Sequence, residues 1–367
     1  MVLNDEPSNS EENPFSRYYA QLTHQQNMLQ DTVRTGTYQK AVVTNPLDFN
    51  DKVILDVGTG SGILAIFAAR AGARKVYAVE ASDIADAARK LVRANGLENI
   101  VQVIKGKVEE VDLPEKVDLI ISEPMGFLLV HERMLESYVL ARERFLKPGG
   151  RMFPSTGTMF FLPFSDWNIY NEQSMKAEFW SNNNFHGVDL SCLKDEAVLE
   201  NFSQAVVGCF DPATVISNLN QPATHFVDFQ TVTGKQLQDI MVNFEFKITA
   251  TAIMHGFACW FDVDFIGTQT TVTLSTSPTK PTTHWYQCRL LLSKPIAVNA
   301  SQVIKGSIHL KANDKYSYDA QIQVQIEGTA IETLSEVRLQ DQVYHYLQSS
   351  QAASTGVYDG ISRDNNM

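Results

Sequence analysis

The chain has 367 residues, of which 44% are hydrophobic, and its 30 lysines and arginines face 42 aspartates and glutamates, for a net charge of −12. This length allows two domains, and the acidic balance disfavours direct nucleic-acid binding. Because no apolar run could cross a membrane and Met1 to Asn13 is too polar for a signal peptide, we expect an intracellular protein without membrane contact. The cysteines lack zinc-site spacing, so we expect reduced packing residues and no metal: Cys192, Cys209, Cys259 and Cys288.

The N-terminal region contains a polar tail and a helical segment. Residues 1–14 are rich in polar and acidic side chains, and we expect them to be disordered. From Phe15 to about Thr44 the apolar residues recur at helical spacing. We expect Thr35-Gly36-Thr37 to break this helical segment.

Between Asp51 and Gly150, predicted strands alternate with predicted helices. The expected strands are 53–57, 76–79, 101–104 and 117–121, and the expected helices are 63–71, 84–94 and one after Glu132. This alternation predicts a doubly wound parallel sheet in an α/β domain that spans residues 15–153. We expect Lys147-Pro148-Gly149-Gly150 to end the last helix.

Beyond Met152 the pattern changes to short β-branched and aromatic runs, such as 241–250, 257–265, 270–274 and 317–326. They predict a second, mostly antiparallel β domain over residues 154–347, followed by a flexible tail at 348–367. The segment at 165–202 interrupts this domain with aromatic residues that we expect to be exposed: Trp167, Tyr170, Phe179, Trp180 and Phe185. Such aromatics suit a subunit contact, and the alternative is that they pack onto their own domain.

A glycine-rich turn follows the first predicted strand. Gly58, Gly60 and Gly62 are spaced G-x-G-x-G, whereas a dinucleotide site needs G-x-G-x-x-G. Glycines allow the backbone to approach a ligand closely. The pattern resembles motif I of S-adenosylmethionine-dependent methyltransferases. Glu80 ends the second strand, where such folds place the acid that binds the ribose hydroxyls.

Two glutamates follow the fourth predicted strand. Glu123 comes directly after this strand, where open parallel sheets bind ligands, and Glu132 follows nine residues later. The helical spacing from Leu128 onward predicts that Glu132 lies in the first turns of a helix. Two carboxylates suit a guanidinium, which donates from a planar fork. The alternative is that Glu132 is a solvated helix residue and Glu123 a cap.

Three motifs together resemble a known family: Ile54 to Gly62, Ser122 to Glu132, and Thr283-His284-Trp285. From Phe15 to about Tyr346 the chain is similar to type I protein arginine methyltransferases, most of all to the coactivator-associated class. The resemblance implies a Rossmann-like domain, a β-barrel, and a helical arm at 165–202 that makes a homodimer. It also implies methyl transfer from S-adenosylmethionine to protein arginine, giving mono- and asymmetric dimethylarginine. Histones or RNA-binding proteins would be substrates, in the nucleus and cytoplasm, with a role in transcription regulation.

The resemblance also implies roles for individual residues. As catalytic residues, Glu123 and Glu132 would bind the substrate guanidinium, and His284 would pair with Asp31. Within the cofactor site, Gln25 and Arg34 would hold the methionine part, and Glu80 the ribose. Its remaining members are Tyr19, Met28, Gly58, Gly60, Gly62, Lys107, Val108, Glu109 and Ser137. The substrate-binding residues are Met125, Phe127, His131, Met134, Trp285 and Tyr286.

Some positions depart from the family or distinguish its members. Phe15-Ser16-Arg17-Tyr18-Tyr19 keeps only the last tyrosine of the usual Tyr-Phe-x-x-Tyr, and we expect no separate N-terminal docking domain before Phe15. Met28 stands where relatives with symmetric or monomethylated products carry phenylalanine. The alternatives are a methyltransferase for another amine, which predicts an Asn/Asp-Pro-Pro-Tyr element after the fourth strand, and a non-catalytic scaffold, which predicts loss of a glutamate or of the glycine turn.

Overall fold

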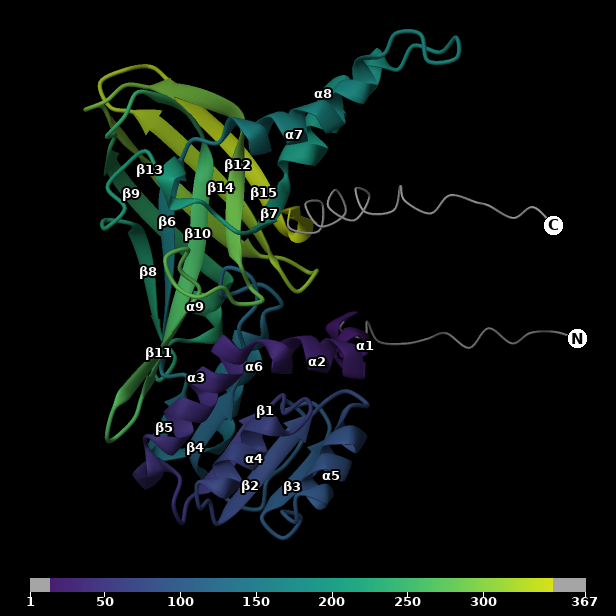
Figure 1. Cartoon of the computed structure of the whole chain (residues 1–367), viewed down its shortest axis with the longest axis vertical. Helices are drawn as coiled ribbons and strands as arrows, with labels where there is room; N and C mark the ends of the chain where they lie inside the picture. The colour runs from purple at the N-terminus through teal and green to yellow at the C-terminus, as the bar shows by residue number, and fades with distance from the viewer. Residues whose placement is uncertain (1–13, 346–367) are drawn as a thin grey trace, which may run out of the picture. The chain divides into compact units, whose positions relative to one another are not determined.

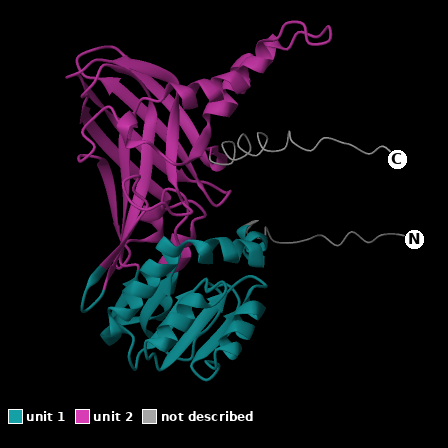
Figure 2. Cartoon of the chain, in the orientation of Figure 1, with its two compact units in different colours: residues 1–123, 140–153, 267–271 teal, residues 124–139, 154–266, 272–367 magenta. Residues whose placement is uncertain are grey.

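The computed structural model describes residues 14–345, and Figure 2 shows that the chain forms two compact units. Unit 1 comprises Met1–Glu123, Leu140–Phe153 and Gly267–Thr271, and unit 2 comprises Pro124–Val139, Pro154–Ile266 and Val272–Met367. The chain thus first passes between units at Glu123 and Pro124, before the boundary expected at residue 153. The tails expected at 1–14 and 348–367 lie outside the described residues, apart from Pro14.

Unit 1 contains a five-stranded sheet in the order β3-β2-β1-β4-β5, and all four pairings are parallel. This confirms the predicted doubly wound sheet. Its strands are β1 (Val53–Val57), β2 (Lys75–Glu80), β3 (Val101–Lys105), β4 (Val117–Ser122) and β5 (Leu146–Phe153). Strand β5 corrects one prediction, because Lys147-Pro148-Gly149-Gly150 lies inside this strand rather than at a helix end. Proline is tolerated there because β5 is an edge strand.

Helices pack on this sheet and precede it in the chain. They are α1 (Pro14–Tyr19), α2 (Leu22–Gln30), α3 (Thr32–Val43), η1 (Pro46–Asp48), α4 (Ile63–Arg70), α5 (Ala85–Ala94) and α6 (Met134–Phe145), which runs through both units (Figure 1). The expected break at Thr35-Gly36-Thr37 is wrong, because these residues lie inside α3. The break is at Asp31, whose carboxylate caps α3 by accepting the N–H of Arg34 at 2.9 Å. Of the helices between residues 14 and 345, none has the length and apolar character needed to cross a membrane.

Unit 2 is a curved sheet of mostly antiparallel strands in the order β8-β6-β10-β12-β7-β15-β14-β13-β9, with β11 beside β10 (Figure 1). The first and last strands of this order contact each other, so the sheet is nearly closed like a barrel, as predicted. The strands are β6 (Thr156–Phe164), β7 (Gln204–Gly208), β8 (Ala223–Asp228), β9 (Asp239–Lys247), β10 (Ala252–Ile266), β11 (Thr271–Ser275), β12 (Gln287–Val298), β13 (Val303–Ala312), β14 (Tyr318–Ile326) and β15 (Glu332–Tyr344). Short helices η4 (Pro212–Thr214) and α9 (Gly234–Gln238) connect strands.

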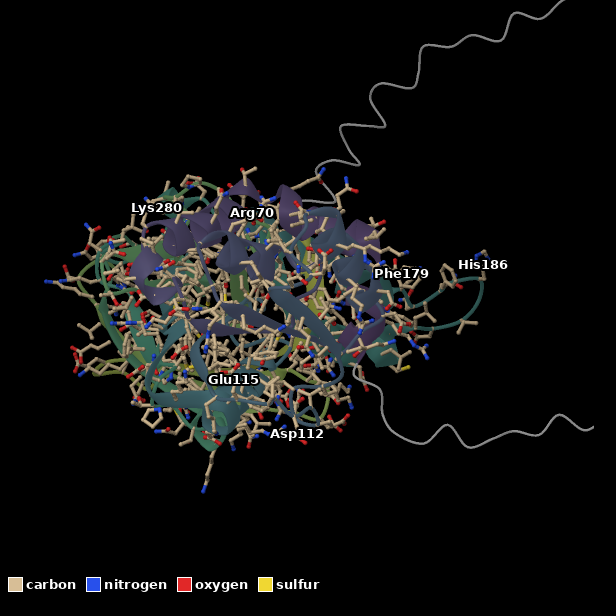
Figure 3. All side chains as sticks on the ribbon, turned by 90° about the horizontal axis from the view of Figure 1, so that it is seen from below. Arg70, Asp112, Glu115, Phe179, His186 and Lys280 are labelled. Atoms are coloured by element: carbon tan, nitrogen blue, oxygen red, sulfur yellow. The ribbon has the colours of Figure 1, made fainter. Side chains whose placement is uncertain are left out.

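A helical arm projects from the strands of unit 2 (Figure 1). It consists of α7 (Trp167–Glu178), η2 (Phe179–Ser181), η3 (Ser191–Leu193) and α8 (Lys194–Phe202). Phe179 and His186 lie on its outer part, as Figure 3 shows. Phe179 and Phe185 are exposed as predicted, and so is Trp167, but Tyr170 and Trp180 are half-buried. The inner end of the arm packs on the strands through an apolar cluster: Phe164, Ile169, Phe202, Val206, Phe210, Ala258 and Leu291.

The four cysteines differ in their surroundings. Cys259 and Cys288 lie opposite each other on β10 and β12, and both are buried free thiols. Burial raises the pKa of Cys288 to about 12, because a thiolate there would be desolvated. Cys192 and Cys209 are free and exposed, so the expectation that all four are packing residues is wrong for these two.

Candidate active site

The glycine turn of unit 1 needs glycine at each of its three positions. Gly58, Gly60 and Gly62 have φ values of 67°, 54° and 88°, a region that disfavours side chains. Gln25 of α2 lies directly over this turn, since its Oε1 accepts the N–H of Ser61 at 3.0 Å. A Cβ at Gly60 would come within 2.7 Å of the same oxygen. The structure therefore brings the predicted residue Gln25 onto the predicted glycine turn.

Glu80 connects the end of β2 to the glycine turn. Its Oε2 accepts the N–H of Gly60 at 2.8 Å, and its Oε1 accepts the N–H of Ser82 at 2.8 Å. A carboxylate has about four acceptor positions, so each oxygen can accept another donor. Glu80 is thus held at the carboxyl edge of the sheet with acceptor capacity for a pair of hydroxyl groups.

Arg34 and Glu123 form a buried ion pair in unit 1. Nε and Nη2 of Arg34 donate to the same oxygen, Oε2 of Glu123, at 3.1 and 3.0 Å. The side chains are only 7% and 10% exposed. Nη1 of Arg34 makes longer contacts, at 3.4 Å, with the carbonyl oxygen of Met28 and with Oγ1 of Thr35. The glutamate expected to bind a substrate guanidinium therefore binds a guanidinium of its own chain.

Two further polar residues of this site, Asp56 and Tyr38, were not predicted from the sequence. Asp56 at the end of β1 is fully buried, and desolvation raises its pKa to about 7, although Thr59 Oγ1 donates to its Oδ2 at 2.6 Å. The available signal was its place two residues before Gly58, at the start of the glycine turn. Tyr38 donates from its hydroxyl to the carbonyl oxygen of Ser122 at 2.8 Å, which fixes the residue before Glu123.

The predicted adenine-binding residues Lys107, Val108 and Glu109 follow β3 in unit 1. Val108 is buried, and the other two are exposed. Arg144 holds this loop, because its Nη1 donates to the carbonyl oxygens of Val108 and Glu109 at 2.8 and 2.6 Å. Sequence reasoning missed Arg144, which lies 36 residues away from Val108 in the chain.

Unit 2 contains the loop that carries Glu132. The expectation that Glu132 lies in a helix is wrong, because α6 begins only at Met134. Four non-glycine residues of this loop have positive φ: Leu128 (51°), Leu129 (69°), Glu132 (73°) and Arg133 (57°). Such conformations are strained and are concentrated at functional sites. A helix would not hold Glu132 in this backbone conformation.

Close packing holds this loop in its strained form. A Cβ at Gly126 would overlap the carbonyl oxygen of His131, so no other residue fits there. Trp285 is buried, and its Nε1 donates to the carbonyl oxygen of Met125 at 3.0 Å. The structure therefore brings the predicted residues Met125 and Trp285 together.

The other residues predicted to contact substrate also lie in unit 2, as do Ser137, predicted for the cofactor site, and the predicted catalytic residue His284. His131 is buried, its ring stacks near Phe127 at 6.0 Å, and its Nδ1 lies 2.8 Å from Oγ of Ser317. Burial lowers the pKa of His131 to about 4, so it is neutral at pH 7. Met134 begins α6, Ser137 follows in its first turn, and the rings of His284 and Trp285 lie 3.9 Å apart. Tyr286 has a positive φ of 49°.

Two predicted pairings join residues of different units. Glu123 belongs to unit 1 and Glu132 to unit 2, and Asp31 and His284 are divided in the same way. Their joint action stays a prediction. Tyr19 lies in unit 1, where its carbonyl oxygen accepts from Nε2 of Gln25 at 3.0 Å.

Comparison with known proteins gives a consistent result. Residues 155–329 match the family described as the arginine methyltransferase oligomerization subdomain, and residues 42–155 match ribosomal protein L11 methyltransferase (PrmA). Histone-arginine methyltransferases named CARMER, from Anopheles gambiae and Drosophila ananassae, are 46% identical over 355 residues, or 97% of this chain. The chain spans 56% and 66% of the lengths of these two relatives.

Solved structures show the same relationship. Arabidopsis thaliana protein arginine methyltransferase 10 is 34% identical with a TM-score of 0.81, covering 88% of this chain and 99% of that one. The Trypanosoma brucei PRMT1 enzyme–prozyme heterotetrameric complex with AdoHcy is 33% identical with a TM-score of 0.79, again over 88% and 99%. From its fold, its motifs and these relatives, the chain belongs to the protein arginine methyltransferase family.

Proposed function

We propose that this chain transfers methyl groups from S-adenosylmethionine to the guanidinium of arginine residues in proteins. The observation that carries the proposal is the Arg34–Glu123 pair, in which Glu123 binds a guanidinium through two donors. Glu123 follows β4 at the carboxyl edge of the parallel sheet, where ligands of such sheets bind. A carboxylate at this position that accepts from one arginine suits another arginine equally well.

The residues of unit 1 fit the proposed cofactor. The glycine turn allows close backbone approach, and Glu80 keeps acceptor capacity for the ribose hydroxyls. Lys107, Val108 and Glu109 are the proposed residues around adenine. S-adenosylmethionine supplies an electrophilic methyl group attached to a positively charged sulfur. The related Trypanosoma brucei complex was solved with AdoHcy, the product of such a transfer.

The proposed role of Arg34 requires an exchange of partners. Its Nε–Nη2 edge, occupied by Glu123, is the edge that a carboxylate of the methionine group would also use. We propose that this carboxylate takes Arg34 from Glu123, which leaves Glu123 available to the substrate guanidinium. Gln25, already hydrogen bonded to the glycine turn, would close α2 over the methionine group.

The chemistry asked of the protein is mainly positioning. Arginine is protonated at neutral pH, so its nitrogens are weak nucleophiles. Glu123 and Glu132 would draw the positive charge toward one side of the guanidinium and leave the other terminal nitrogen to attack the methyl group in line. After transfer, Glu132 or the pair of His284 and Asp31 would take the proton that leaves.

Substrates, partners and location are part of the same proposal. The relatives' name, histone-arginine methyltransferase, supports histones as substrates and the nucleus as a site of action, and we extend both to RNA-binding proteins and the cytoplasm. The match to an oligomerization subdomain supports assembly, and we propose a homodimer made by the arm at 165–202. The exposed Phe179 and Phe185 are its proposed contact residues.

A direct experiment separates this function from its rivals. The full chain is incubated with labelled S-adenosylmethionine and separate panels of arginine-rich proteins, nucleic acids and small amines, and the protein products are hydrolysed. We expect label only in proteins, recovered as monomethyl- and asymmetric dimethylarginine. Label in nucleic acid or small amines would support a methyltransferase for another amine. Absence of label with intact cofactor binding would support a non-catalytic scaffold.

A further inference from the structure

Arg289 is a buried cation whose main hydrogen-bonding edge has no acceptor. It lies on β12 opposite Ala258 of β10 and Val206 of β7, so it faces the apolar cluster between the strands and the arm. The residue is 2% exposed. Within residues 14–345, neither its Nε nor its Nη2 has a hydrogen-bond partner. Buried charged donors without acceptors are rare in proteins, because desolvating them is costly.

The two atoms concerned form one functional unit. Nε and Nη2 present parallel N–H groups along one edge of the guanidinium, which fits two oxygens of a carboxylate or phosphate. Arg34 shows the same edge in use, since its Nε and Nη2 both donate to Glu123. In Arg289 this edge is complete, buried and without an acceptor in the described part of the chain.

A second buried donor lies in the same region. Nδ1 of His255 accepts the backbone N–H of Asp166 at 3.0 Å, so the proton of the neutral ring is on Nε2. This Nε2 is also buried and has no partner among the described residues. His255 is 2% exposed. Asp166 caps α7, so both unpaired donors belong to the root of the arm, where Asp166 interacts electrostatically with His255 and Arg289.

The neighbouring acids are committed to other groups. Oδ1 of Asp166 accepts the backbone N–H groups of Asn168 and Ile169 at 3.0 and 3.3 Å. Glu172 pairs with Lys176 at 3.3 Å and with His345 at 3.4 Å. Moving either carboxylate to Arg289 would break a helix cap, or the ion pair of Glu172 with Lys176 together with its contact with His345. An acceptor from outside the described residues can accept hydrogen bonds from Nε and Nη2 of Arg289 without breaking these interactions.

We propose that Arg289 and His255 form a binding site for a small oxyanion, a carboxylate or a phosphate, at the root of the arm. The rings of Trp167, which is 59% exposed, and of the half-buried Tyr170 lie next to His255, with centroids 6.1 and 5.1 Å from that of its ring. The anion pairs with the guanidinium between the arm and the strands and so strengthens the packing of α7 and α8. This links the position of the arm to the concentration of an anion.

The test is calorimetric titration of the full chain with inorganic phosphate, and separately with acetate, at ionic strength held constant with sodium chloride. We expect saturable binding of one anion per chain. Arg289→Met, which keeps a straight side chain but removes the fork, should weaken binding at least about tenfold. Arg289→Lys, with a charge but no planar fork, should bind more weakly than the unmutated chain. Tight binding of acetate alone would identify a carboxylate ligand, and of phosphate alone a phosphate ligand.

Controls separate this proposal from unfolding and from a general charge effect. Lys305→Met removes one positive charge from an exposed position paired with Glu245 and Glu327, and it should leave anion binding unchanged. In chloride buffer Arg289→Met should unfold at a temperature no lower than the unmutated chain, because it removes an unpaired buried charge. Absence of saturable binding, equal binding by Arg289→Met, or marked destabilisation of this variant in chloride would each overturn the proposal.

Discussion

Arg34 donates from both Nε and Nη2 to a single oxygen of Glu123, so the glutamate proposed for substrate already binds an arginine of its own chain. The pair is buried, with side chains 7% and 10% exposed. Loss of either partner would leave an unpaired charge in a largely water-free place. A substitution of Arg34 or Glu123 should therefore change both the stability of unit 1 and the proposed methyl transfer.

The first prediction concerns Glu123→Gln. We expect methyl transfer to be abolished and cofactor affinity to fall by no more than a few-fold, because Glu123 is proposed to face the substrate guanidinium and to compete with the methionine carboxylate for Arg34. The free energy of unfolding should fall by about 2 kcal/mol, since the buried guanidinium of Arg34 loses its counter-charge and keeps only hydrogen bonds to an uncharged amide. Turnover, calorimetry and chemical denaturation measure the three effects. Glu245→Gln, at an exposed glutamate, is the control, and a folded Glu123→Gln with equally lost cofactor binding would contradict the assignment.

The second prediction concerns the glycine turn. Gly60→Arg should remove cofactor binding, because φ at Gly60 is 54° and a Cβ would come within 2.7 Å of Oε1 of Gln25. Calorimetry with S-adenosylmethionine measures the loss. Gly36→Ala is the matched control: nothing lies within 4 Å of the added Cβ, and Gly36 is inside α3. This variant should gain about 0.5–1 kcal/mol of stability and keep its affinity. Normal affinity in Gly60→Arg would mean that the turn does not hold the cofactor.

The third prediction concerns His131 and pH. Burial lowers its pKa to about 4, from 6.5 in the unfolded chain. As the pH falls from about 6.5 to about 4, the unfolded chain takes up a proton that the folded chain does not. The free energy of unfolding should therefore decrease over this range, by at most about 3 kcal/mol from this residue. His131→Gln should lose this part of the pH dependence in denaturation experiments.

The difference between His131→Gln and the unmutated chain is the quantity to compare, because Asp56 acts in the opposite direction. Its pKa rises to about 7 on folding, so its contribution to stability decreases as the pH rises from about 4 toward 7. Subtracting the pH dependence of His131→Gln from that of the unmutated chain removes the contribution of Asp56, which both proteins share. The same pH dependence in both proteins would show that His131 does not titrate as stated.

The fourth prediction concerns the outer part of the arm. Phe179→Ser combined with Phe185→Ser should convert a homodimer to monomers and reduce turnover, because these side chains are 50% and 40% exposed on the proposed contact surface. Analytical ultracentrifugation measures the assembly. The substitutions leave Ile169 of the apolar cluster untouched, so the arm stays attached. Leu334→Ser, at a 70% exposed leucine of β15, is the control, and an unchanged dimer in the double variant would remove the arm from the interface.

The fifth prediction concerns the product. Met28 is half-buried on α2, and its carbonyl oxygen accepts from Nη1 of Arg34 at 3.4 Å, so it lies beside the proposed methyl-transfer site. A flexible methionine leaves room for a nitrogen that already bears one methyl group, which a rigid ring would not. Asymmetric dimethylarginine should be the final product of exhaustive methylation. Met28→Phe should shift the hydrolysed products toward monomethyl- or symmetric dimethylarginine, and symmetric product from the unmutated chain would refute the assignment.

Local sequence patterns were sufficient to predict those features that depend on residues close together in the chain. The alternation of strands and helices predicted the parallel sheet, and the acid at the end of β2 identified Glu80. Strand β5 was missed because Lys147-Pro148-Gly149-Gly150 has the composition of a helix terminator. Its glycine is needed for packing, since a Cβ at Gly150 would come within 2.9 Å of the carbonyl oxygen of Asp118 on β4.

Contacts between distant residues could not be predicted in this way. The helical spacing of apolar residues from Leu128 onward belongs to α6 only from Met134, whereas Leu128 and Leu129, which are 2% and 0% exposed, are buried in the strained loop before this helix. Arg34 and Glu123 are 89 residues apart, and nothing in the sequence near either residue indicates that they pair. The pKa of Asp56 likewise depends on burial that only the folded chain creates.

The close approach of Gly126 to the carbonyl oxygen of His131 determines which variants of this loop can remain active. Every other amino acid carries a Cβ, so in a saturation scan of residues 124–133 position 126 should yield no active variant, however small the new side chain. The exposed Gly149, with nothing within 4 Å of an added Cβ, should by contrast accept asparagine, which tolerates positive φ. Enrichment sequencing would therefore record position 126 as the place where the loop allows no chemical variation at all.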